Sequence, residues 1–411
     1  MSETVDTRAQ DAAVTVVPLV EPRGGVPPVI DTPAALDAAI AALRTTAGPI
    51  AVDAERASGY RYSQRAYLVQ LHREPAPIML IDPIALPDLR AVSEVIADSE
   101  WVLHAASQDL PSLREVGLAP TALFDTELAA RLAGYERVGL GAMVELVLHR
   151  SLAKEHSAAD WSRRPLPEPW LRYAALDVDI LVDLRDALEA ELGRQGKLEW
   201  ARQEFTAVLN AAPPPPRTDP WRRTSGIHRV RNRRQLAVVR ALWFARDELA
   251  RRRDIAPGRV LGDSAIIAAA TAAPADAEAL GRVPGWGGRS TRRLVPQLWP
   301  TIAAVGALSD AELPRPALSG DGPPPPSRWP DRDPAAAGRL ARAREALATV
   351  AQTHSMPVEN LLTPELVRRL AWSPPGTDLA TIEDYLRAGG ARPWQVELTS
   401  QPLAAAMTPL P

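Results

Sequence analysis

The stretch Pro49-Ile50-Ala51-Val52-Asp53-Ala54-Glu55 decides the fold of the first half of this chain. Its even-numbered residues are apolar and point to one side of an extended segment, whereas Asp53 and Glu55 leave the other side. The apolar flanks predict a central, buried strand. Two carboxylates on one face of such a strand repel each other and resist loss of water unless a cation is present. The alternative, from this pair alone, is an edge strand whose two acids are solvated.

The segments around this strand predict an α/β domain. Pro33 occupies the first position of a predicted helix that runs to about Leu43. The segments that follow are predicted, in order, as strands at Tyr67–His72 and Ile78–Asp82, a helix at Leu86–Ala97, a strand at Trp101–His104, a helix at Ser107–Val116 that Ser107 caps, and helices from Asp125 onward. A three-stranded meander followed by βα units is typical of a mixed sheet flanked by helices.

Three further polar residues occupy positions typical of a binding site. Asp109 follows the predicted strand 101–104, and ligands usually bind where strands of open α/β sheets end. By itself, Asp109 is also explained as an acid in the first turn of a helix. Tyr173 and Asp177 are four residues apart and therefore share one helix face. The competing interpretation of this pair is a surface acid beside a tyrosine at the edge of the core.

The net charge of −3 conceals a polarised chain. Residues 1–216 carry a net charge of −11, residues 217–300 carry +10, and residues 301–411 carry −2. A basic block of this kind indicates a polyanionic partner, most simply nucleic acid, and Arg229, Arg231, Arg233 and Arg234 are its candidate phosphate contacts. The alternative is a solvated charged face.

Composition excludes several classes of protein. The chain has no cysteine, so disulfides and thiolate chemistry are excluded, and its six histidines make a structural zinc site a poor prediction. Metal chemistry would rely on carboxylates, which suit Mg²⁺ or Mn²⁺. No apolar run approaches the roughly 20 residues of a membrane helix, so no membrane partner is expected. The first 11 residues lack the basic and apolar regions of a secretory signal, and we expect a cytoplasmic protein.

Two runs of four prolines, at 213–216 and 323–326, mark the predicted boundaries, because such runs favour extended spacers. We expect the chain to divide into a disordered segment at 1–24, an α/β domain at 25–210, a linker at 211–221, a helical domain at 222–312, a linker at 313–332 and a second helical domain at 333–411.

Taken together, the motifs of residues 28–205 resemble the ribonuclease D family within the DEDD superfamily of 3′–5′ exonucleases. The resemblance rests on Asp53-Ala54-Glu55, Tyr67-Leu68-Val69-Gln70-Leu71, Leu103-His104-Ala105-Ala106-Ser107-Gln108-Asp109-Leu110, Phe124-Asp125-Thr126-Glu127-Leu128-Ala129, Asp160-Trp161-Ser162-Arg163-Arg164-Pro165-Leu166 and Tyr173-Ala174-Ala175-Leu176-Asp177. It implies a ribonuclease H-like fold. Because Arg172 stands where the histidine subgroup has its histidine, the resemblance is to the tyrosine subgroup.

This resemblance implies a site and an activity. Asp53, Glu55, Asp109 and Asp177 would bind two divalent ions, Mg²⁺ or Mn²⁺, and Tyr173 would orient the attacking water. His104 and Gln108 would steady the substrate or the metal ligands, although a structural role explains each of them equally well. The implied enzyme is a 3′–5′ exoribonuclease that releases nucleoside 5′-monophosphates from single-stranded RNA 3′ ends, with tRNA precursors or other stable RNAs as substrates.

Two alternatives remain at the level of sequence. A DNA 3′–5′ exonuclease would use the same residues, since nothing in the sequence identifies a contact to the 2′-hydroxyl. A nucleic-acid-binding protein with an inactive nuclease fold is the other alternative, and the presence of all four carboxylates and Tyr173 argues against it. The oligomeric state is left open.

Downstream, residues 228–250 resemble the first helix of an HRDC domain, a small helical module that binds nucleic acids and in some cases proteins. Residues 281–287 resemble a later turn of the same module. Residues 335–406 are the candidate for a second HRDC-like domain, which we interpret as a packing or positioning module because the segment is slightly acidic.

Overall fold

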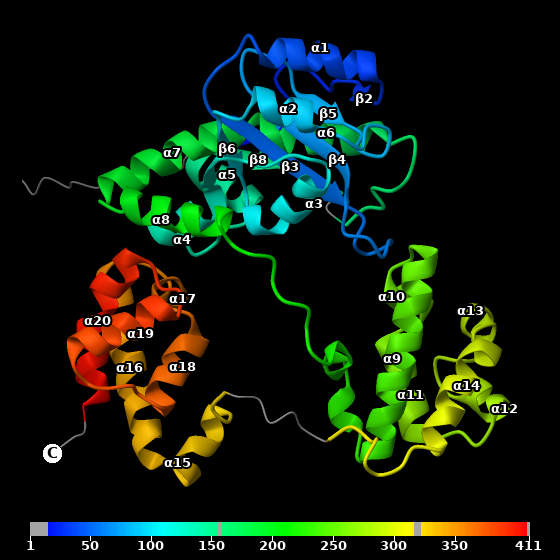
Figure 1. The fold of residues 1–411 in the computed structure, drawn as a ribbon. Helices are drawn as coiled ribbons and strands as arrows, with labels where there is room; N and C mark the ends of the chain where they lie inside the picture. Colours follow the sequence, from blue (N-terminus) through cyan, green and yellow to red (C-terminus); the bar gives the residue numbers. More distant parts are fainter. Residues whose placement is uncertain (1–14, 154–155, 157, 316–321, 409–411) are drawn as a thin grey trace, which may run out of the picture.

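A computed structural model describes residues 15–153, 156, 158–315 and 322–408. Its elements form three units, which Figure 1 shows in sequence colours. We call them the sheet unit (residues 15–210), the middle helical unit (220–315) and the C-terminal helical unit (322–408). The predicted order, an α/β unit with a mixed sheet followed by helical units, is confirmed.

The main sheet of the sheet unit has six strands. In spatial order they are β2 (Val29–Ile30), β5 (Met79–Ile81), β4 (Ala66–His72), β3 (Ile50–Arg56), β6 (Glu100–Leu103) and β7 (Ala122–Asp125). β3, β4 and β5 form the predicted antiparallel meander, whereas β6 and β7 continue the sheet in parallel. β7 was not predicted, although β6, which has the same length, was.

The strand β3 lies inside the sheet, between β4 and β6, so the alternative of a solvated edge strand is wrong. Val52 and Ala54 enter the large core on one face, and Ala51 enters the core on the other face, under helix α6 (Glu168–Asp179). Asp53 and Glu55 share the α6 side with Ala51. The alternation in the sequence therefore points both carboxylates toward one helix.

The remaining helices of the sheet unit follow the prediction with two corrections. They are α1 (Pro33–Leu43), α2 (Arg90–Val95), α3 (Leu110–Glu115), α4 (Thr126–Ala133), α5 (Leu140–Leu148), α7 (Leu181–Arg194) and α8 (Leu198–Leu209). α2 is shorter than expected. Ser107 is not a helix cap, because it lies within the 3₁₀ turn η1 (Ala106–Gln108), which displaces the start of α3 to Leu110.

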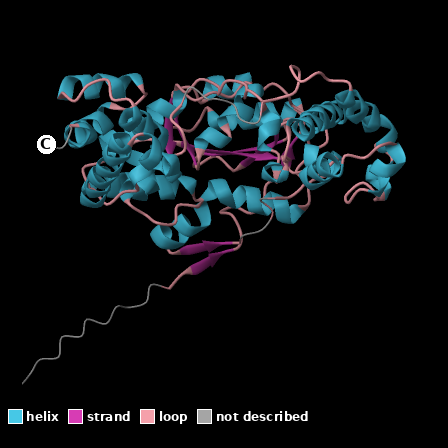
Figure 2. Ribbon diagram, turned by 90° about the horizontal axis from the view of Figure 1, so that it is seen from below, coloured by secondary structure: helices cyan, strands magenta, loops and turns pink. Residues whose placement is uncertain are grey.

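The expectation of disorder over residues 1–24 is wrong for its last part, and residues 1–14 lie outside the described ranges. β1 (Val17–Leu19) pairs in parallel with β8 (Arg150–Leu152), and Figure 2 shows this ribbon apart from the main sheet. The segment acquires order here because the edge of β8 supplies backbone partners that a sequence pattern does not reveal.

The middle helical unit packs around its own core, in which Trp221 and Trp286 are fully buried. Its elements are η2 (Pro220–Arg223), η3 (Ile227–Arg229), α9 (Arg233–Arg253), α10 (Pro257–Val260), α11 (Asp263–Ala272), α12 (Ala277–Arg282), α13 (Arg289–Arg292) and α14 (Val295–Gly306). Because Trp221 belongs to this core, the unit begins slightly before the predicted boundary at 222.

The C-terminal helical unit comprises η4 (Pro326–Arg328), α15 (Trp329–Arg332), α16 (Pro334–Thr353), α17 (Val358–Leu361), α18 (Pro364–Trp372), α19 (Leu379–Ala388) and α20 (Pro393–Met407). Trp329 is fully buried, so the end of the predicted 313–332 linker belongs to this unit. The unit docks on α8: Trp200 stacks on Trp394 with ring centroids 5.1 Å apart, and Glu204 accepts hydrogen bonds from Arg392 and the Trp394 indole.

The middle helical unit contacts the sheet unit through the loop between β3 and β4. The Asp254 carboxylate accepts the backbone N–H groups of Tyr62 and Ser63, at 3.2 and 3.0 Å. Tyr62 donates its hydroxyl proton to Asp247, and Arg259 lies 3.9 Å from the Tyr60 ring centroid. Figure 1 shows this loop reaching toward α9 and α10. Among the described residues, no helix is both long and apolar enough to cross a membrane.

Candidate active site

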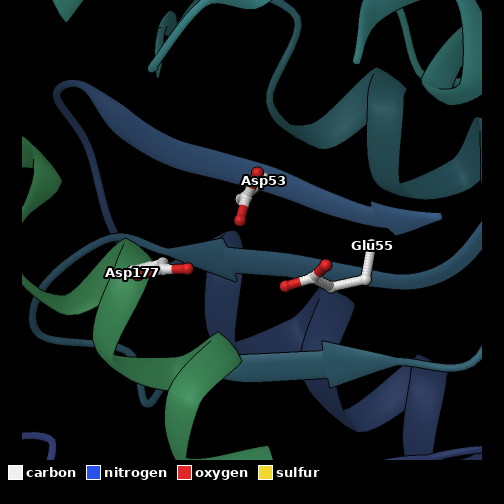
Figure 3. Close-up of side chains that lie close together, drawn as sticks. All are labelled: Asp53, Glu55 and Asp177. Atoms are coloured by element: carbon white, nitrogen blue, oxygen red, sulfur yellow. The ribbon is translucent and has the colours of Figure 1, made fainter. Parts of the chain in front are cut away.

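Three carboxylates converge on one face of β3. Ligand atoms of Asp53, Glu55 and Asp177 all lie within 4.8 Å of one another, a spacing at which one divalent cation can be held. Figure 3 shows the two strand residues and the helix residue directed into one space. β3 fixes two of the carboxylates by its alternation, and α6 supplies the third because its buried face packs on β3 and β4.

Asp109 lies in the same place but outside that group of three. It lines, with the three clustered carboxylates, a cavity of about 330 Å³ that also reaches His104, Gln108 and Tyr173. One oxygen of Asp109 lies 3.6 Å from the guanidinium of Arg56. Arg56 follows Glu55 at a bulge in β3. The fold therefore brings all seven residues that the sequence singled out in the sheet unit to one cavity.

The carboxylates are destabilised as anions. Burial raises the pKa of Asp53 to about 6 and that of Asp109 to about 8, and the Asp53 charge contributes to the second shift. Burial and the surrounding carboxylates hold the pKa of Glu55 and of Asp177 well above their ordinary values. A cluster of four acids that resists ionisation is the electrostatic condition in which a bound cation is most favourable.

Tyr173 lies one helical turn before Asp177 and hydrogen-bonds to its carboxylate. Burial, Asp177 and Glu55 raise the pKa of the phenol, so Tyr173 stays protonated at any physiological pH. Trp161 packs near the ring, with centroids 6.5 Å apart, and Trp161 is itself fully buried. The hydroxyl is thus a fixed hydrogen-bond donor and not a base.

His104 presents one ring nitrogen to the cavity. Its Nδ1 lies 2.9 Å from the Thr126 hydroxyl, which donates its own proton to the Leu103 carbonyl oxygen. Since that hydroxyl has a single proton, we assign the Nδ1–H of His104 as the donor to it. Burial lowers the pKa of His104 to about 4, so the ring is neutral and Nε2 is a hydrogen-bond acceptor.

Asp125 has a structural role. It caps α4 through the N–H groups of Glu127 and Leu128, and it also accepts those of Ala105 and Ala106. Ala105 has a φ of 61°, a left-handed conformation that costs free energy for a residue with a Cβ. The hydrogen bonds to Asp125 hold this turn. The turn leads into η1, and so it sets the position of Asp109, which directly follows η1.

A further polar residue, Gln70, escaped the sequence interpretation. It is fully buried, stands opposite Asp53 in the β3–β4 register, and neither polar atom of its amide has a hydrogen-bond partner. Unpaired buried amides are costly, and this one lies directly across the strand pair from Asp53. The signal available in the sequence was a glutamine inside an otherwise apolar strand.

The four predicted phosphate contacts lie in the middle helical unit and divide into two pairs. Arg233 donates to the carbonyls of Asp310, Leu313 and Pro314, and Arg234 donates to those of Val305, Gly306 and Leu308. Arg229 and Arg231 are exposed. Arg231, Arg233 and Arg234 line a groove of about 930 Å³ together with Arg222 and His228.

Comparison with protein families places each unit. Residues 27–193 match a family model described as a 3′–5′ exonuclease, and residues 235–302 match the HRDC domain. Residues 322–407 match a separate model, a 3′ to 5′ exonuclease C-terminal domain. The C-terminal helical unit is therefore matched by a model other than the HRDC domain that the sequence suggested for it.

Whole-chain relatives agree with these matches. A ribonuclease D of Gluconacetobacter diazotrophicus is 32% identical over 346 residues, which cover 82% of this chain and 84% of the relative. A ribonuclease D of Acidiphilium cryptum is 36% identical over 280 residues, which cover 66% of this chain and 67% of the relative.

Two solved structures extend the likeness to the arrangement of all three units. A protein from Bifidobacterium adolescentis is 40% identical, with a TM-score of 0.88 over 95% of this chain and 99% of that one. Ribonuclease D of Escherichia coli, described as an exoribonuclease involved in structured RNA processing, is 25% identical, with a TM-score of 0.65 over 92% and 98% of the two chains.

Proposed function

Because the chain belongs to the ribonuclease D family of 3′–5′ exonucleases, we propose that it trims the 3′ ends of structured RNAs such as tRNA precursors and releases nucleoside 5′-monophosphates. The single observation that carries the chemistry is the convergence of Asp53, Glu55 and Asp177 within 4.8 Å in a cavity that also contains Asp109 and Tyr173. The E. coli relative supports the choice of structured RNA.

In this proposal Asp53, Glu55, Asp109 and Asp177 hold two divalent ions, Mg²⁺ or Mn²⁺. When bound, such ions supply positive charge to the scissile phosphate and its leaving oxygen, and they make water nucleophilic at neutral pH. The four carboxylates fit this role because they are hard oxygen ligands from separate elements whose mutual repulsion a cation relieves.

The tyrosine positions the nucleophile. Tyr173 retains its proton and points at Asp177, so its hydroxyl can hydrogen-bond an attacking water in line with the phosphorus without removing a proton from it. The ring lies beside the buried Trp161, with centroids 6.5 Å apart. The attack breaks the bond from phosphorus to the 3′ oxygen of the preceding nucleotide, which leaves with the chain.

In this proposal His104 and Gln108, which line the cavity with the carboxylates, contact the terminal nucleotide. The neutral Nε2 of His104 accepts a hydrogen bond, and ribose hydroxyl groups are the donors that a 3′-terminal nucleotide offers. Gln108 is exposed, lines the same cavity and offers both a donor and an acceptor.

The body of the RNA binds elsewhere, along the groove of the middle helical unit that Arg231 and Arg222 line. This unit carries the basic excess of residues 217–300, and its match to the HRDC domain supports nucleic-acid binding. The two arginines bonded to backbone carbonyls keep their positive charge, since a carbonyl does not neutralise it, and so still add to the field of the groove.

A matched pair of oligonucleotides tests the proposal. The full chain should shorten a 3′-tailed RNA hairpin one nucleotide at a time with Mg²⁺ or Mn²⁺, release 5′-monophosphates, and stop in EDTA. The same sequence as DNA should be cut more slowly. Faster cleavage of the DNA would replace the RNA substrate by DNA, and metal-dependent binding without cleavage of either would leave a nucleic-acid-binding protein.

A further inference from the structure

The helix that carries Tyr173 and Asp177 is held from outside by a short N-terminal segment. We call residues 17–25 the N-terminal strap. Its strand β1 pairs with β8, the Val17 N–H donates to the His149 carbonyl at 2.9 Å, and Figure 2 shows this two-stranded ribbon apart from the main sheet. Gly24 and Gly25 then turn the chain with φ of 94° and 80°, a region that glycine adopts without strain.

Arg23, at the end of the strap, joins three elements of the sheet unit. Its backbone N–H donates to the Asp179 carboxylate at 3.0 Å, and its guanidinium lies 3.7 Å from the same group. The guanidinium also pairs with Asp183 in the first turn of α7, and with Glu74 at 3.0 Å in the turn between β4 and β5. One side chain therefore bridges the end of α6, the start of α7 and the sheet.

The partner Asp179 needs this contact, because its side chain is completely buried. A buried carboxylate without compensating charge is strongly destabilising. Besides Arg23, the ring of His72 on β4 lies 3.9 Å from the Asp179 carboxylate. Since Asp179 is the last residue of α6, two positions after Asp177, a change at Asp179 displaces the end of the helix that carries a proposed ligand.

A second strap contact touches the same helix on the other side of the site. Glu21 lies 2.9 Å from the Arg172 guanidinium, and Arg172 directly precedes Tyr173. The two contacts thus bracket the helix segment that supplies Tyr173 and Asp177. The Glu21 pair is largely exposed and worth little by itself, so the buried Asp179 contact dominates.

We propose that Arg23 is a positioning residue of the active site: through Asp179 it fixes the end of α6, and with it the distance of Asp177 and Tyr173 from the carboxylates of β3. The inference rests on the proposed function for its catalytic readout. It assigns to the N-terminal strap, which no motif of the sequence marks, a part in catalysis at a distance from the substrate.

The test compares Arg23→Ala with Arg194→Ala in the full chain. Arg194 lies at the other end of α7 and pairs with Glu191, so its loss removes an exposed ion pair of the same helix without touching α6. On a short RNA, Arg23→Ala should lower kcat by about fivefold to a hundredfold with KM close to that of the wild type. The Mn²⁺ concentration for half-maximal activity should rise by about tenfold. Arg194→Ala should change neither.

Two measurements that need no turnover keep the result interpretable. Amide hydrogen exchange of residues 172–179 should accelerate in Arg23→Ala but not in Arg194→Ala. Mn²⁺ affinity, measured by electron paramagnetic resonance, should likewise fall in Arg23→Ala but not in Arg194→Ala. Unchanged exchange and unchanged Mn²⁺ affinity in folded Arg23→Ala would overturn the inference. A wild-type chain without activity on RNA would overturn the proposed function instead, and these two measurements would still decide the role of Arg23.

Discussion

Removal of a single oxygen atom tests the role of Tyr173. Tyr173→Phe removes the hydroxyl that bonds Asp177 and leaves the packing against Trp161 intact. We expect kcat to fall by about 10²–10³, the range of a lost transition-state hydrogen bond, while RNA affinity and melting temperature stay near those of the wild type. A variant with normal kcat and weakened RNA binding would place the hydroxyl on the substrate.

Asp177 is buried among other carboxylates, so its negative charge is destabilising unless a cation is bound. Asp177→Asn preserves volume and an acceptor for Tyr173, so the metal-free variant should melt at or above the wild-type temperature. Cleavage should be abolished. Differential scanning calorimetry with and without Mn²⁺ gives the control, because only the wild type should gain much stability from the ion. Wild-type turnover at saturating metal would exclude Asp177 as a ligand.

The raised pKa values of Asp53 and Asp109 predict how the metal-free protein responds to pH. Each carboxyl binds its proton more tightly when folded, so its stabilising contribution is complete below the unfolded pKa of 3.8 and is lost as pH rises through about 6 and about 8. In EDTA, the melting temperature should therefore fall between pH 5 and 8 more steeply for the wild type than for Asp109→Asn. Parallel curves would mean that these acids ionise without penalty.

At the scale of one element, variants at and just before the N-terminal end of α9 distinguish arginines that stabilise the fold from arginines that bind RNA. Arg233 is committed to three backbone carbonyls of residues 310–314, so Arg233→Ala should reduce the free energy of unfolding by about 1–3 kcal/mol. The exposed Arg229 and Arg231 serve as matched controls for stability. Their removal should change stability little and flatten the plot of log K for RNA against log salt by about 0.7 per contact. Chemical denaturation and filter binding measure the two effects.

At the scale of the whole molecule, the two helical units do more than add surface. Truncation after Ala212 removes the basic groove. It also removes Asp247, Asp254 and Arg259, which contact the loop between β3 and β4, close to Glu55 in the chain. The fragment should still cut short RNA with metal, but more slowly than the full chain. Its affinity for a long RNA should depend less steeply on salt, by about 0.7–0.9 in slope for each lost phosphate contact. Equal slopes would exclude the middle helical unit as an RNA contact.

Two variants of Asp254 separate the loss of the loop contacts from the loss of the basic groove. In the full chain, Asp254→Gly keeps the left-handed backbone of that position but removes the acceptor of two loop N–H groups, whereas Asp254→Asn keeps both. Turnover of a short RNA should fall in the glycine variant and be retained in the asparagine variant. Such a result would show that the fragment turns over RNA slowly because it lacks the loop contacts. Its weaker RNA affinity would then be due to the missing arginines.

The sequence by itself determined the mixed sheet, the inward direction of Asp53 and Glu55, and the shared helix face of Tyr173 and Asp177. Each of these follows from a local period, since alternation and the four-residue turn act over a few residues. The resemblance then united motifs that lie more than a hundred residues apart in the chain. Four short strands, β1, β2, β7 and β8, escaped, although β5 and β6, of three and four residues, were predicted.

Only the tertiary structure decided which polar groups are already satisfied and which are not. Arg233 and Arg234 resemble Arg229 and Arg231 in the sequence, yet their bonds to carbonyls of residues 305–314 exist only after the chain has folded back. The unpaired Gln70 and the clamp of Arg23 on Asp179 depend likewise on elements distant in sequence. Hydrogen bonds and ion pairs act over a few ångströms of space, and no pattern along the chain specifies which distant residues come that close.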